Sequence, residues 1–240
     1  SSAASDVYKR QRHDTRIREG MSIMKQSKEK HKMYFAVKRG TDIFLSLFGI
    51  IALIPAWIVL AAAVKCESRG PVLFKQKRVG VGKKYFYILK FRTMRTDTPK
   101  DVPTHLLKDP DQYITRTGKM LRKLSLDELP QIFNILRGDM SIIGPRPALW
   151  NQYDLIQARD RYGANDILPG LTGWAQINGR DELEIPVKAR LDGEYTEELK
   201  KGGLRGLAMD VRCFFGTIIN VVRREGVVEG GTGELHNAEN

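Results

Sequence analysis

The sequence predicts a mostly helical α+β fold in which an N-terminal membrane helix-break-helix precedes a compact cytosolic domain. Three observations indicate this class. An uncharged stretch of 22 residues runs from Ile43 to Val64. Residues 72–94 carry Val, Phe, Tyr and Ile around Gly80 and Gly82, which is typical of a short β-hairpin. After residue 112, several segments have the apolar spacing of helices.

The composition divides the chain into four parts. Its 240 residues are enough for one domain with a small accessory part. Residues 1–33 are polar and basic and predict a disordered tail. Residues 34–66 form the predicted re-entrant membrane hairpin, and residues 67–225 form the cytosolic domain. Residues 226–240 are rich in glycine and predict a flexible C-terminal tail.

The apolar stretch is long and hydrophobic enough to enter a bilayer. As a helix it measures roughly 33 Å, about the thickness of the hydrocarbon core. Thirteen of its residues are Leu, Ile, Phe or Val, which together favour insertion by about 4 to 8 kcal/mol. Pro55 near its middle costs roughly 3 kcal/mol in a helix interior. Insertion is therefore favoured despite the proline.

The flanks of this stretch predict that it turns back rather than crosses. Lys38 and Arg39 precede it, while Lys65 and Arg69 follow it, and basic flanks prefer the cytoplasmic side. Pro55 removes a backbone donor and bends the helix. We therefore predict a re-entrant hairpin, with a single-pass anchor kinked at the proline as the alternative.

The charge and the scattered Cys and His residues limit the possible functions. A net charge of +12 points to a polyanionic partner, which could be nucleic acid, an anionic membrane face or phosphorylated substrates. The two cysteines lie far apart, and the four histidines are scattered. This pattern argues against a structural zinc site, a histidine metal site and a Ser-His-Asp triad.

The cytosolic part alternates predicted helices with loops. We expect helices at 112–123, 127–137, 149–162, 183–201 and 204–224, with a break near Ser125, a loop at 138–147 and a turn-rich stretch at 169–180. The last helix has an apolar face, which we assign to core packing in preference to an interfacial position. That face comprises Leu207, Val211, Phe214, Phe215, Ile218 and Val222.

Asp127 and Glu128 are adjacent carboxylates with two possible roles. Ser125 and Glu128 fit a capping box, and Asp127 could be the cap instead, which would place Pro130 in the tolerated first turn. Either register puts a carboxylate at a helix N-terminus, where the dipole keeps it ionised and phosphate can bind. A phosphoryl-transfer nucleophile needs such a setting. Capping and catalysis both remain open at this point.

Cations and aromatic residues supply possible binding groups. Eight Lys and Arg residues and several aromatic ones lie between Phe74 and Arg95, which also fits a single-stranded nucleic-acid platform or attraction to lipid headgroups. Arg146 stands between two prolines, and this rigidity suits an arginine that must face a phosphate or carboxylate. Trp174, in a Gly-rich turn, is assigned to the core.

The order of these motifs resembles that of a known family. Lys38-Arg39-x-x-Asp42 precedes the proline-broken segment. The motifs that follow are Phe74-x-Gln76-x-Arg78-x-Gly80, Lys90-Phe-Arg-Thr-Met94, Thr117-Gly118-x-x-Leu121-Arg122, Ser125-Leu-Asp-Glu-Leu-Pro-Gln131, Ser141-Ile-Ile-Gly-Pro-Arg-Pro147 and Pro169-Gly-Leu-Thr-Gly-Trp174. From Lys38 to at least Tyr195 the chain resembles the bacterial sugar transferases, which are monotopic polyprenyl-phosphate phosphoglycosyl transferases, in their small minimal form.

The resemblance implies a reaction. An aspartate that matches Asp127 would attack a UDP-sugar, expel UMP and form a covalent phosphosugar intermediate. Polyprenyl (undecaprenyl) phosphate would then accept the sugar phosphate, in the first membrane step of bacterial polysaccharide and glycoconjugate synthesis. Glu128 would act as a base or position Mg²⁺, and Asp127 would be a Mg²⁺ ligand. The catalytic domain would lie on the cytoplasmic face of the bacterial inner membrane.

The resemblance also assigns supporting roles. Substrate or phosphate binding falls to Arg78, Lys90, Arg92, Arg122, Gln131 and Arg146, and the membrane segment includes Lys38, Arg39, Asp42 and Pro55. The family often breaks this segment at a Ser-Pro pair, whereas here it is Ile54-Pro55. No nucleic acid is expected as a partner. The alternative function is a membrane-anchored nucleic-acid-binding or scaffold protein, which would leave the order of the motifs unexplained.

Overall fold

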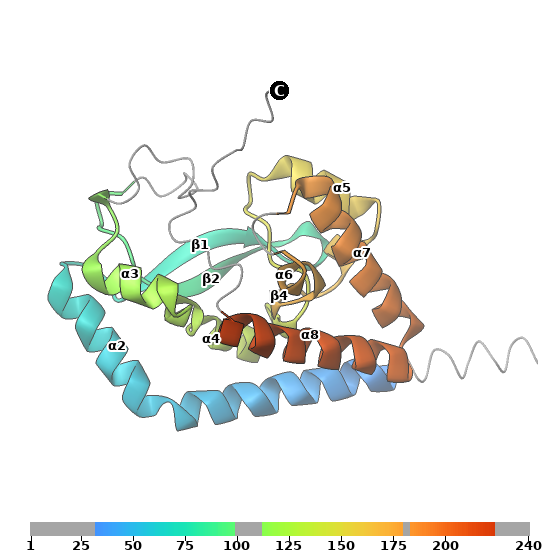
Figure 1. Ribbon diagram of the computed structural model, residues 1–240, viewed down its shortest axis with the longest axis horizontal. Coiled ribbons are helices and arrows are strands. Elements are labelled where there is room, and N and C mark those ends of the chain that lie inside the picture. The colour runs from blue at the N-terminus through green and yellow to red at the C-terminus, as the bar shows by residue number, and fades with distance from the viewer. Residues whose placement is uncertain (1–31, 99–111, 180–182, 224–240) are drawn as a thin grey trace, which may run out of the picture.

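The computed structural model describes residues 32–98, 112–179 and 183–223 (Figure 1). Within these ranges the protein is a mostly helical α+β structure, as predicted. The predicted C-terminal tail lies outside the described residues, as does the predicted N-terminal tail except for residues 32 and 33, which are helical.

The N-terminal segment is a long helix, Lys32–Ala52, followed after a break by α2, Ile54–Glu67, and the two are bent by 67°. Pro55 stands in the first turn of α2. Backbone N–H groups in the first turn have no partner within the helix, so the missing N–H of proline costs no helical hydrogen bond there. The break predicted at this proline is confirmed. In the described ranges no single helix is long and apolar enough to span a bilayer, although this bent pair together meets those requirements.

The predicted hairpin is also confirmed. Strand β1, Leu73–Val79, pairs antiparallel with β2, Tyr85–Phe91, in the register that places Phe74 opposite Lys90. The short 3₁₀ turn η1, Val81–Lys83, connects them, and Gly82 there has a φ of 60°, a left-handed conformation that glycine adopts without strain.

Three helical elements follow the gap at 99–111. They are α3, Arg116–Lys123, the 3₁₀ turn η4, Leu126–Glu128, and α4, Gln131–Arg137. Ser125 separates the first two in a left-handed conformation, with φ 54°. The break near Ser125 is therefore where it was predicted, whereas the helix expected from residue 127 begins at Gln131.

A small parallel sheet occupies two stretches predicted as loop and turn. Strand β3, Ser141–Ile143, pairs with β4, Gly170–Thr172. The connection contains α5, Tyr153–Asp160, and the 3₁₀ turn η5, Ala164–Asp166. Gly144 and Gly170 let the two backbones approach, since a Cβ on Gly170 would lie 2.1 Å from the Gly144 nitrogen.

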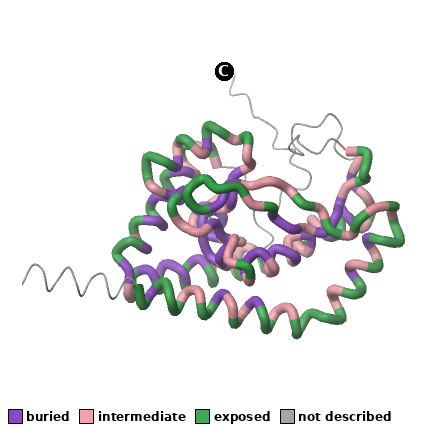
Figure 2. Tube along the Cα trace, turned by 180° about the vertical axis from the view of Figure 1, so that it is seen from behind, coloured by how far each residue is buried: buried purple, intermediate pink, exposed green. Residues whose placement is uncertain are grey.

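The C-terminal part consists of α6, Trp174–Ile177, α7, Ile185–Lys201, and α8, Gly203–Arg223. The two long helices were predicted within a few residues of these bounds. Helix α8 runs beside the N-terminal helix along one side of the molecule (Figure 1), and Figure 2 shows many exposed residues along the bent pair.

The expected role of the apolar face of α8 in core packing is wrong. Met209 and Cys213 are buried, and they come from a different face of the helix. The side chains predicted to be buried are instead exposed, for example Phe215 at 58% and Leu207 at 46%. The side chain of Val222 lies outside the described set.

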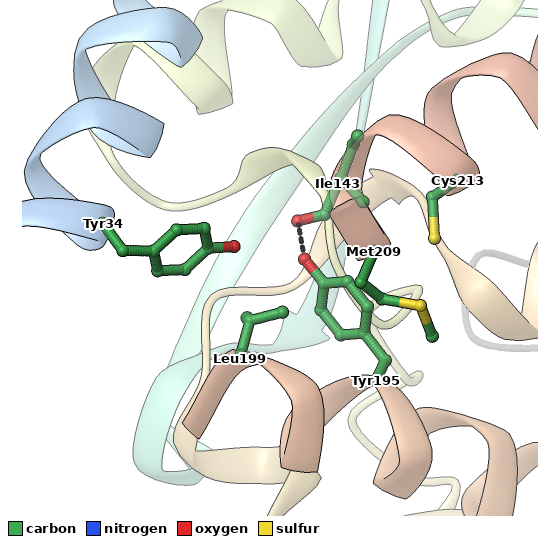
Figure 3. Close-up of a cluster of buried hydrophobic side chains, with 6 residues drawn as sticks. All are labelled: Tyr34, Ile143, Tyr195, Leu199, Met209 and Cys213. Carbon is green, nitrogen blue, oxygen red and sulfur yellow. Dashed lines mark hydrogen bonds between the residues drawn. The ribbon is translucent and has the colours of Figure 1, made fainter. Parts of the chain in front are cut away.

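The N-terminal helix is attached to the domain through buried polar groups. Its Tyr34 enters the core beside Tyr195 and Met209 (Figure 3). The Tyr34 hydroxyl donates to Asp210 of α8 at 2.6 Å, and the ammonium of Lys38 lies 2.9 Å from the same carboxylate. Tyr195 places its hydroxyl 2.7 Å from Asp210 and 3.0 Å from the carbonyl oxygen of Ile143.

Two further residues of this helix reach the domain backbone. The Arg39 guanidinium donates to the carbonyl oxygens of Ile135 and Leu136 at the end of α4, at 2.6 and 2.8 Å. The buried carboxylate of Asp42 accepts the N–H of Ile142 in β3 at 2.9 Å. Lys38, Arg39 and Asp42, which were assigned to the membrane segment, therefore bind the domain directly.

Candidate active site

The Asp127–Glu128 pair lies in η4, ahead of helix α4 rather than at its cap. Neither Ser125 nor Asp127 caps α4, because Pro130 occupies the N-cap position and η4 has no side-chain cap bond. The prediction that Ser125 or Asp127 caps α4 is therefore wrong. The expectation that the dipole of α4 keeps a capping carboxylate ionised is wrong for the same reason. The turn places both carboxyl groups against β2, which contacts η4.

Glu128 is neutralised by two cations. Arg146 contacts both of its carboxylate oxygens, at 2.6 and 3.2 Å, and Lys90 donates to one of them at 2.8 Å. Burial acts to raise the pKa of Glu128, but Arg146 and Lys90 outweigh it and hold the pKa well below its ordinary value. Glu128 is thus an ionised carboxylate that contacts two cations at once.

Asp127 has a different environment although it is the neighbouring residue. It is 9% exposed, and its carboxylate lies 3.9 Å from the Lys90 ammonium. Burial raises the pKa of Asp127; Lys90 opposes this rise, while the negative charge of Glu128 adds to it. From the described parts of the chain, its oxygens accept no hydrogen bond. Asp127 is therefore the less shielded and more basic carboxylate of the pair.

A third cation comes from α3. Arg122 donates from its Nε to the hydroxyl of Thr93 at 2.9 Å, and its charge acts on Asp127. Burial lowers the pKa of Arg122, and Asp127 acts in the opposite direction. Arginine remains charged in proteins. Lys90 on β2, Arg122 on α3 and Arg146 in the loop after β3 therefore surround the two carboxylates from three separate elements.

Two other predicted phosphate ligands bind backbone carbonyls instead. Arg78 donates to the carbonyl of Pro147 at 2.9 Å, so it supports the loop that carries Arg146. Arg92 is buried and donates to the carbonyls of Val64 and Ser68 at the end of α2, at 3.2 and 2.6 Å. The leading charge effects on Asp127 come from Lys90, Glu128, Arg122 and Arg146.

The remaining predictions have mixed outcomes. Gln131 is buried at the start of α4, and its amide has no hydrogen-bond partner within the described residues. Trp174 is half-buried and packs against the core cluster, while its indole N–H donates to Glu194 at 2.9 Å. Its assignment to the core is confirmed in part, because Trp174 lies at the edge of the core and also lines a cavity with Arg205 and Arg212.

Sequence reasoning missed Thr93 and Asn134. Thr93 orients Arg122, and the fully buried amide of Asn134 joins α4 to β2. Thr93 stands in the motif Lys90-Phe-Arg-Thr-Met94, which could have drawn attention to it, whereas a single Asn in a helix offers little signal.

The donor set limits how a metal could bind. No group of three His, Cys, Asp or Glu side chains that could hold an ion occurs in the ranges the structure describes. Glu128 is already engaged by two cations, whereas the carboxylate of Asp127 is available. One carboxylate is a sufficient protein ligand for Mg²⁺ when a phosphorylated substrate supplies further oxygens, so Asp127 fits that role.

The chain matches the bacterial sugar transferase family over residues 33–224. It is 40% identical over 191 residues to an undecaprenyl-phosphate glucose phosphotransferase of Komagataeibacter xylinus, covering 75% of this chain and 35% of that protein. It is 37% identical to a UDP-N-acetylgalactosamine-undecaprenyl-phosphate N-acetylgalactosaminephosphotransferase of Aeromonas hydrophila, covering 79% and 44% of the two chains. This chain thus spans less than half the length of these two relatives.

A relative of similar size gives a fuller match. The exopolysaccharide production protein PSS of Rhizobium leguminosarum bv. phaseoli is 37% identical over 199 residues, which cover 80% of this chain and 98% of that protein. The family match over residues 33–224 includes the bent helix pair from its second residue, the carboxylate pair and its three cations. The chain belongs to the bacterial sugar transferase family.

Proposed function

We propose that this protein transfers a sugar-1-phosphate from a UDP-sugar to undecaprenyl phosphate and releases UMP. The observation that carries the proposal is the carboxylate pair within three cations, in which Asp127 has a raised pKa and Glu128 a strongly lowered one. This arrangement combines a reactive carboxylate with a positive pocket for a diphosphate. The names of the Komagataeibacter and Aeromonas relatives, both undecaprenyl-phosphate sugar phosphotransferases, support the same reaction.

In the first step, a carboxylate oxygen of Asp127 attacks the β-phosphorus of the UDP-sugar. The bond between that phosphorus and the oxygen bridging to the α-phosphate breaks, and UMP leaves with the bonding electrons. The product is an acyl phosphate that joins Asp127 to the sugar phosphate. A raised pKa favours attack, because it marks a more basic and less shielded oxygen.

In the second step, a phosphate oxygen of undecaprenyl phosphate attacks the same phosphorus. The bond to Asp127 breaks and restores its carboxylate, while the sugar becomes attached to the lipid through a diphosphate. No net proton transfer to Glu128 is required in either step. This agrees with its low pKa, which makes Glu128 a weak base.

Glu128 and the cations have a shared function in this scheme. Lys90, Arg122 and Arg146 stabilise the negative charge of the diphosphate and of departing UMP. Glu128 holds Arg146 and Lys90 in place before substrate arrives. Mg²⁺, bound by Asp127 together with substrate phosphate oxygens, would reduce the charge repulsion between carboxylate and diphosphate.

The exposed apolar residues support attachment to a bilayer. The outer sides of the bent helix pair and of α8 expose Phe44, Phe48, Ile51, Ile58, Val59, Leu204, Phe214, Phe215, Ile218 and Ile219. An apolar surface of this extent marks a membrane or protein contact. We place the protein monotopically in the bacterial inner membrane with its site on the cytoplasmic face, where a soluble nucleotide-sugar and a lipid phosphate can both reach Asp127.

The reaction is tested with Asp127→Asn, which removes the attacking charge with little change in shape. Purified protein in vesicles with undecaprenyl phosphate is given a panel of UDP-sugars, and UMP release is measured. Wild type should release UMP with at least one donor, and the variant should release none above background. Asp166→Asn, an exposed position in η5, is the matched control and should retain full activity.

The covalent step is tested separately with donor alone. Wild type incubated with a UDP-sugar labelled in its β-phosphate should retain label on the protein, and hydroxylamine should remove it, as it does from acyl phosphates. UMP release without any trapped label would instead indicate direct transfer to the lipid. A wild type that releases no UMP from any donor but binds nucleic acid would support the binding-protein alternative.

A further inference from the structure

We propose that Asn134 is a positioning residue: its side-chain amide joins β2 to α4 so that Lys90 reaches the carboxylate pair. This inference rests on the transfer reaction proposed above. Asn134 is fully buried, at 0% exposure, and it contacts neither the carboxylates nor the cations through any recorded hydrogen bond.

The amide of Asn134 makes two hydrogen bonds to one edge of β2. Its oxygen accepts the N–H of Leu89 at 2.9 Å, and its nitrogen donates to the carbonyl of Tyr87 at 2.8 Å. Groups two residues apart on a strand point to the same edge, where a neighbouring strand would normally donate and accept. The hairpin sheet has two strands in the described structure, so Asn134 takes the place of a third strand.

This connection lies between the two halves of the site. Lys90 follows Leu89 on β2, and its ammonium is 2.8 Å from Glu128 and 3.9 Å from Asp127. Asn134 lies in the second turn of α4, and Glu128 precedes that helix by only three positions. The same amide therefore fixes the position of the strand that carries the cation relative to the helix that follows the carboxylates.

The dependence on Asn134 follows from the chemistry of lysine. A lysine ammonium is a point charge on a flexible stem, without the rigid fork of a guanidinium. Its position therefore depends on where the backbone is held and on its partner. Without the amide, the N–H of Leu89 and the carbonyl of Tyr87 lose their partners, and β2 can satisfy them only by moving relative to α4. A displacement of about 1 Å can reduce a rate roughly 100-fold.

A double-mutant cycle tests the route through Lys90. Asn134→Leu removes the amide at similar volume, and Lys90→Met removes the ammonium while retaining the stem. We expect Asn134→Leu to lower kcat/KM for UMP release by about 10- to 100-fold in the wild-type background. In the Lys90→Met background, Asn134→Leu should lower kcat/KM by less than about threefold. If Asn134 acts by positioning Lys90, its loss has little further effect once the ammonium is gone, so the two substitutions are non-additive.

The matched control is Asn220→Leu. The Asn220 amide also links two elements, since it donates to the carbonyl of Ile177 at 3.0 Å, and this bond does not involve β2. Asn220→Leu should change kcat/KM by the same factor in the wild-type background and in the Lys90→Met background. Thermal unfolding of every variant shows which proteins are folded, and Asn134→Ala replaces Asn134→Leu if the leucine variant does not fold.

The outcomes separate this inference from the proposed function. If wild type releases UMP but the effects of Asn134→Leu and Lys90→Met multiply independently, Asn134 does not act through Lys90 and the inference is overturned. If wild type releases no UMP with any UDP-sugar, the proposed function fails first. A cycle that is non-additive for Asn134 and additive for Asn220 supports the positioning role.

Discussion

Two adjacent carboxyl groups in the η4 turn differ in basicity because the cations bind one directly and lie farther from the other. Arg146 and Lys90 bind Glu128 directly, whereas Asp127 is 3.9 Å from the nearer of the two and accepts no hydrogen bond within the described residues. In a site with two carboxylates, environments that separate their pKa values also separate their roles. Asp127 is accordingly assigned to attack, and Glu128 to holding the cations.

The low pKa of Glu128 predicts how stability depends on pH. A group whose pKa is lowered on folding adds stability above its unfolded pKa, about 4.3, and this stability is lost as pH falls through the folded value. We therefore expect the Tm difference between wild type and Glu128→Gln to be constant above about pH 5 and to narrow towards pH 3. Thermal melts across pH provide the measurement, with Glu197→Gln as an exposed control. A difference that stays constant to pH 3 would contradict the assignment.

Arg92 and Arg146 are predicted to respond differently to loss of their charge. Arg92→Met removes bonds to the end of α2 and should lower the free energy of unfolding by about 2–3 kcal/mol, with little change in KM for the UDP-sugar. Arg146→Met should lower kcat/KM strongly, because its guanidinium faces the carboxylates. Denaturant unfolding and UMP-release kinetics on both variants check this contrast. A KM effect of Arg92→Met as large as that of Arg146→Met would restore the phosphate-binding role.

The sequence named the three cations that the structure gathers around the carboxylate pair, but it could not separate them from Arg78 and Arg92, which donate to backbone carbonyls. Lys90 and Arg92 are two positions apart, so strand alternation would place both on one face. Strand β2 ends at Phe91, and Arg92 therefore turns towards α2. The end of a strand depends on tertiary contacts, which a local pattern does not contain.

At the scale of elements, the second helix of the bent pair lies next to the site. Helix α2 packs Leu60 and Val64 against Phe91 and Leu121, and Trp57 contacts both Phe91 and Phe133. These partners lie on β2, α3 and α4, the elements that carry or flank the cations and carboxylates. The position of α2 is thus tied to the geometry of the site.

Cysteine accessibility tests whether the pair is re-entrant. Single cysteines at Gly40 and at Arg69, in a background with the native cysteines replaced, should be labelled from the same side of sealed vesicles. Both positions lie beside basic residues that prefer the cytoplasm, and Pro55 allows the chain to turn back between them. Labelling from opposite sides would show a segment that crosses the membrane.

Long elements with their own periodicity could be predicted from the sequence, whereas short elements that depend on distant contacts could not. The hairpin and helices α7 and α8 are long enough for their periodicity to be recognised. Strands β3 and β4 have three residues each and pair across more than 25 positions, so no local pattern could indicate them. Periodicity also located the apolar face of α8 correctly, but it could not say whether protein or lipid covers that face.

At the scale of the whole molecule, apolar exposure is concentrated on the outer sides of the N-terminal helix, α2 and α8. The N-terminal helix and α8 lie side by side (Figure 1), so two of the elements that carry these residues are neighbours. A chain with a net charge of +12 thus carries most of its exposed large apolar side chains on a few helices.

The proposed membrane attachment predicts a measurable contribution from α8. Phe215→Asn with Ile218→Asn should increase the fraction extracted from membranes by alkaline wash, because each apolar side chain adds about 1.5–3 kcal/mol when buried. The Tm should be nearly unchanged, since both residues are exposed. Tyr153→Asn, an exposed site on α5, should leave extraction as in wild type. Equal extraction of all three proteins would show that α8 does not contact the bilayer.

The carboxylate of Asp210 has a practical consequence for the preparation of a water-soluble form of this protein. Deleting the chain up to Asp42 would take away Tyr34 and Lys38 and leave an interior anion with Tyr195 as its one remaining recorded partner, at a cost of about 3–5 kcal/mol. Shortening the protein is therefore a poor route to solubility. Replacing exposed apolar residues with polar ones, while leaving Tyr34 and Lys38 intact, preserves the buried contacts and changes only the solvent-exposed surface.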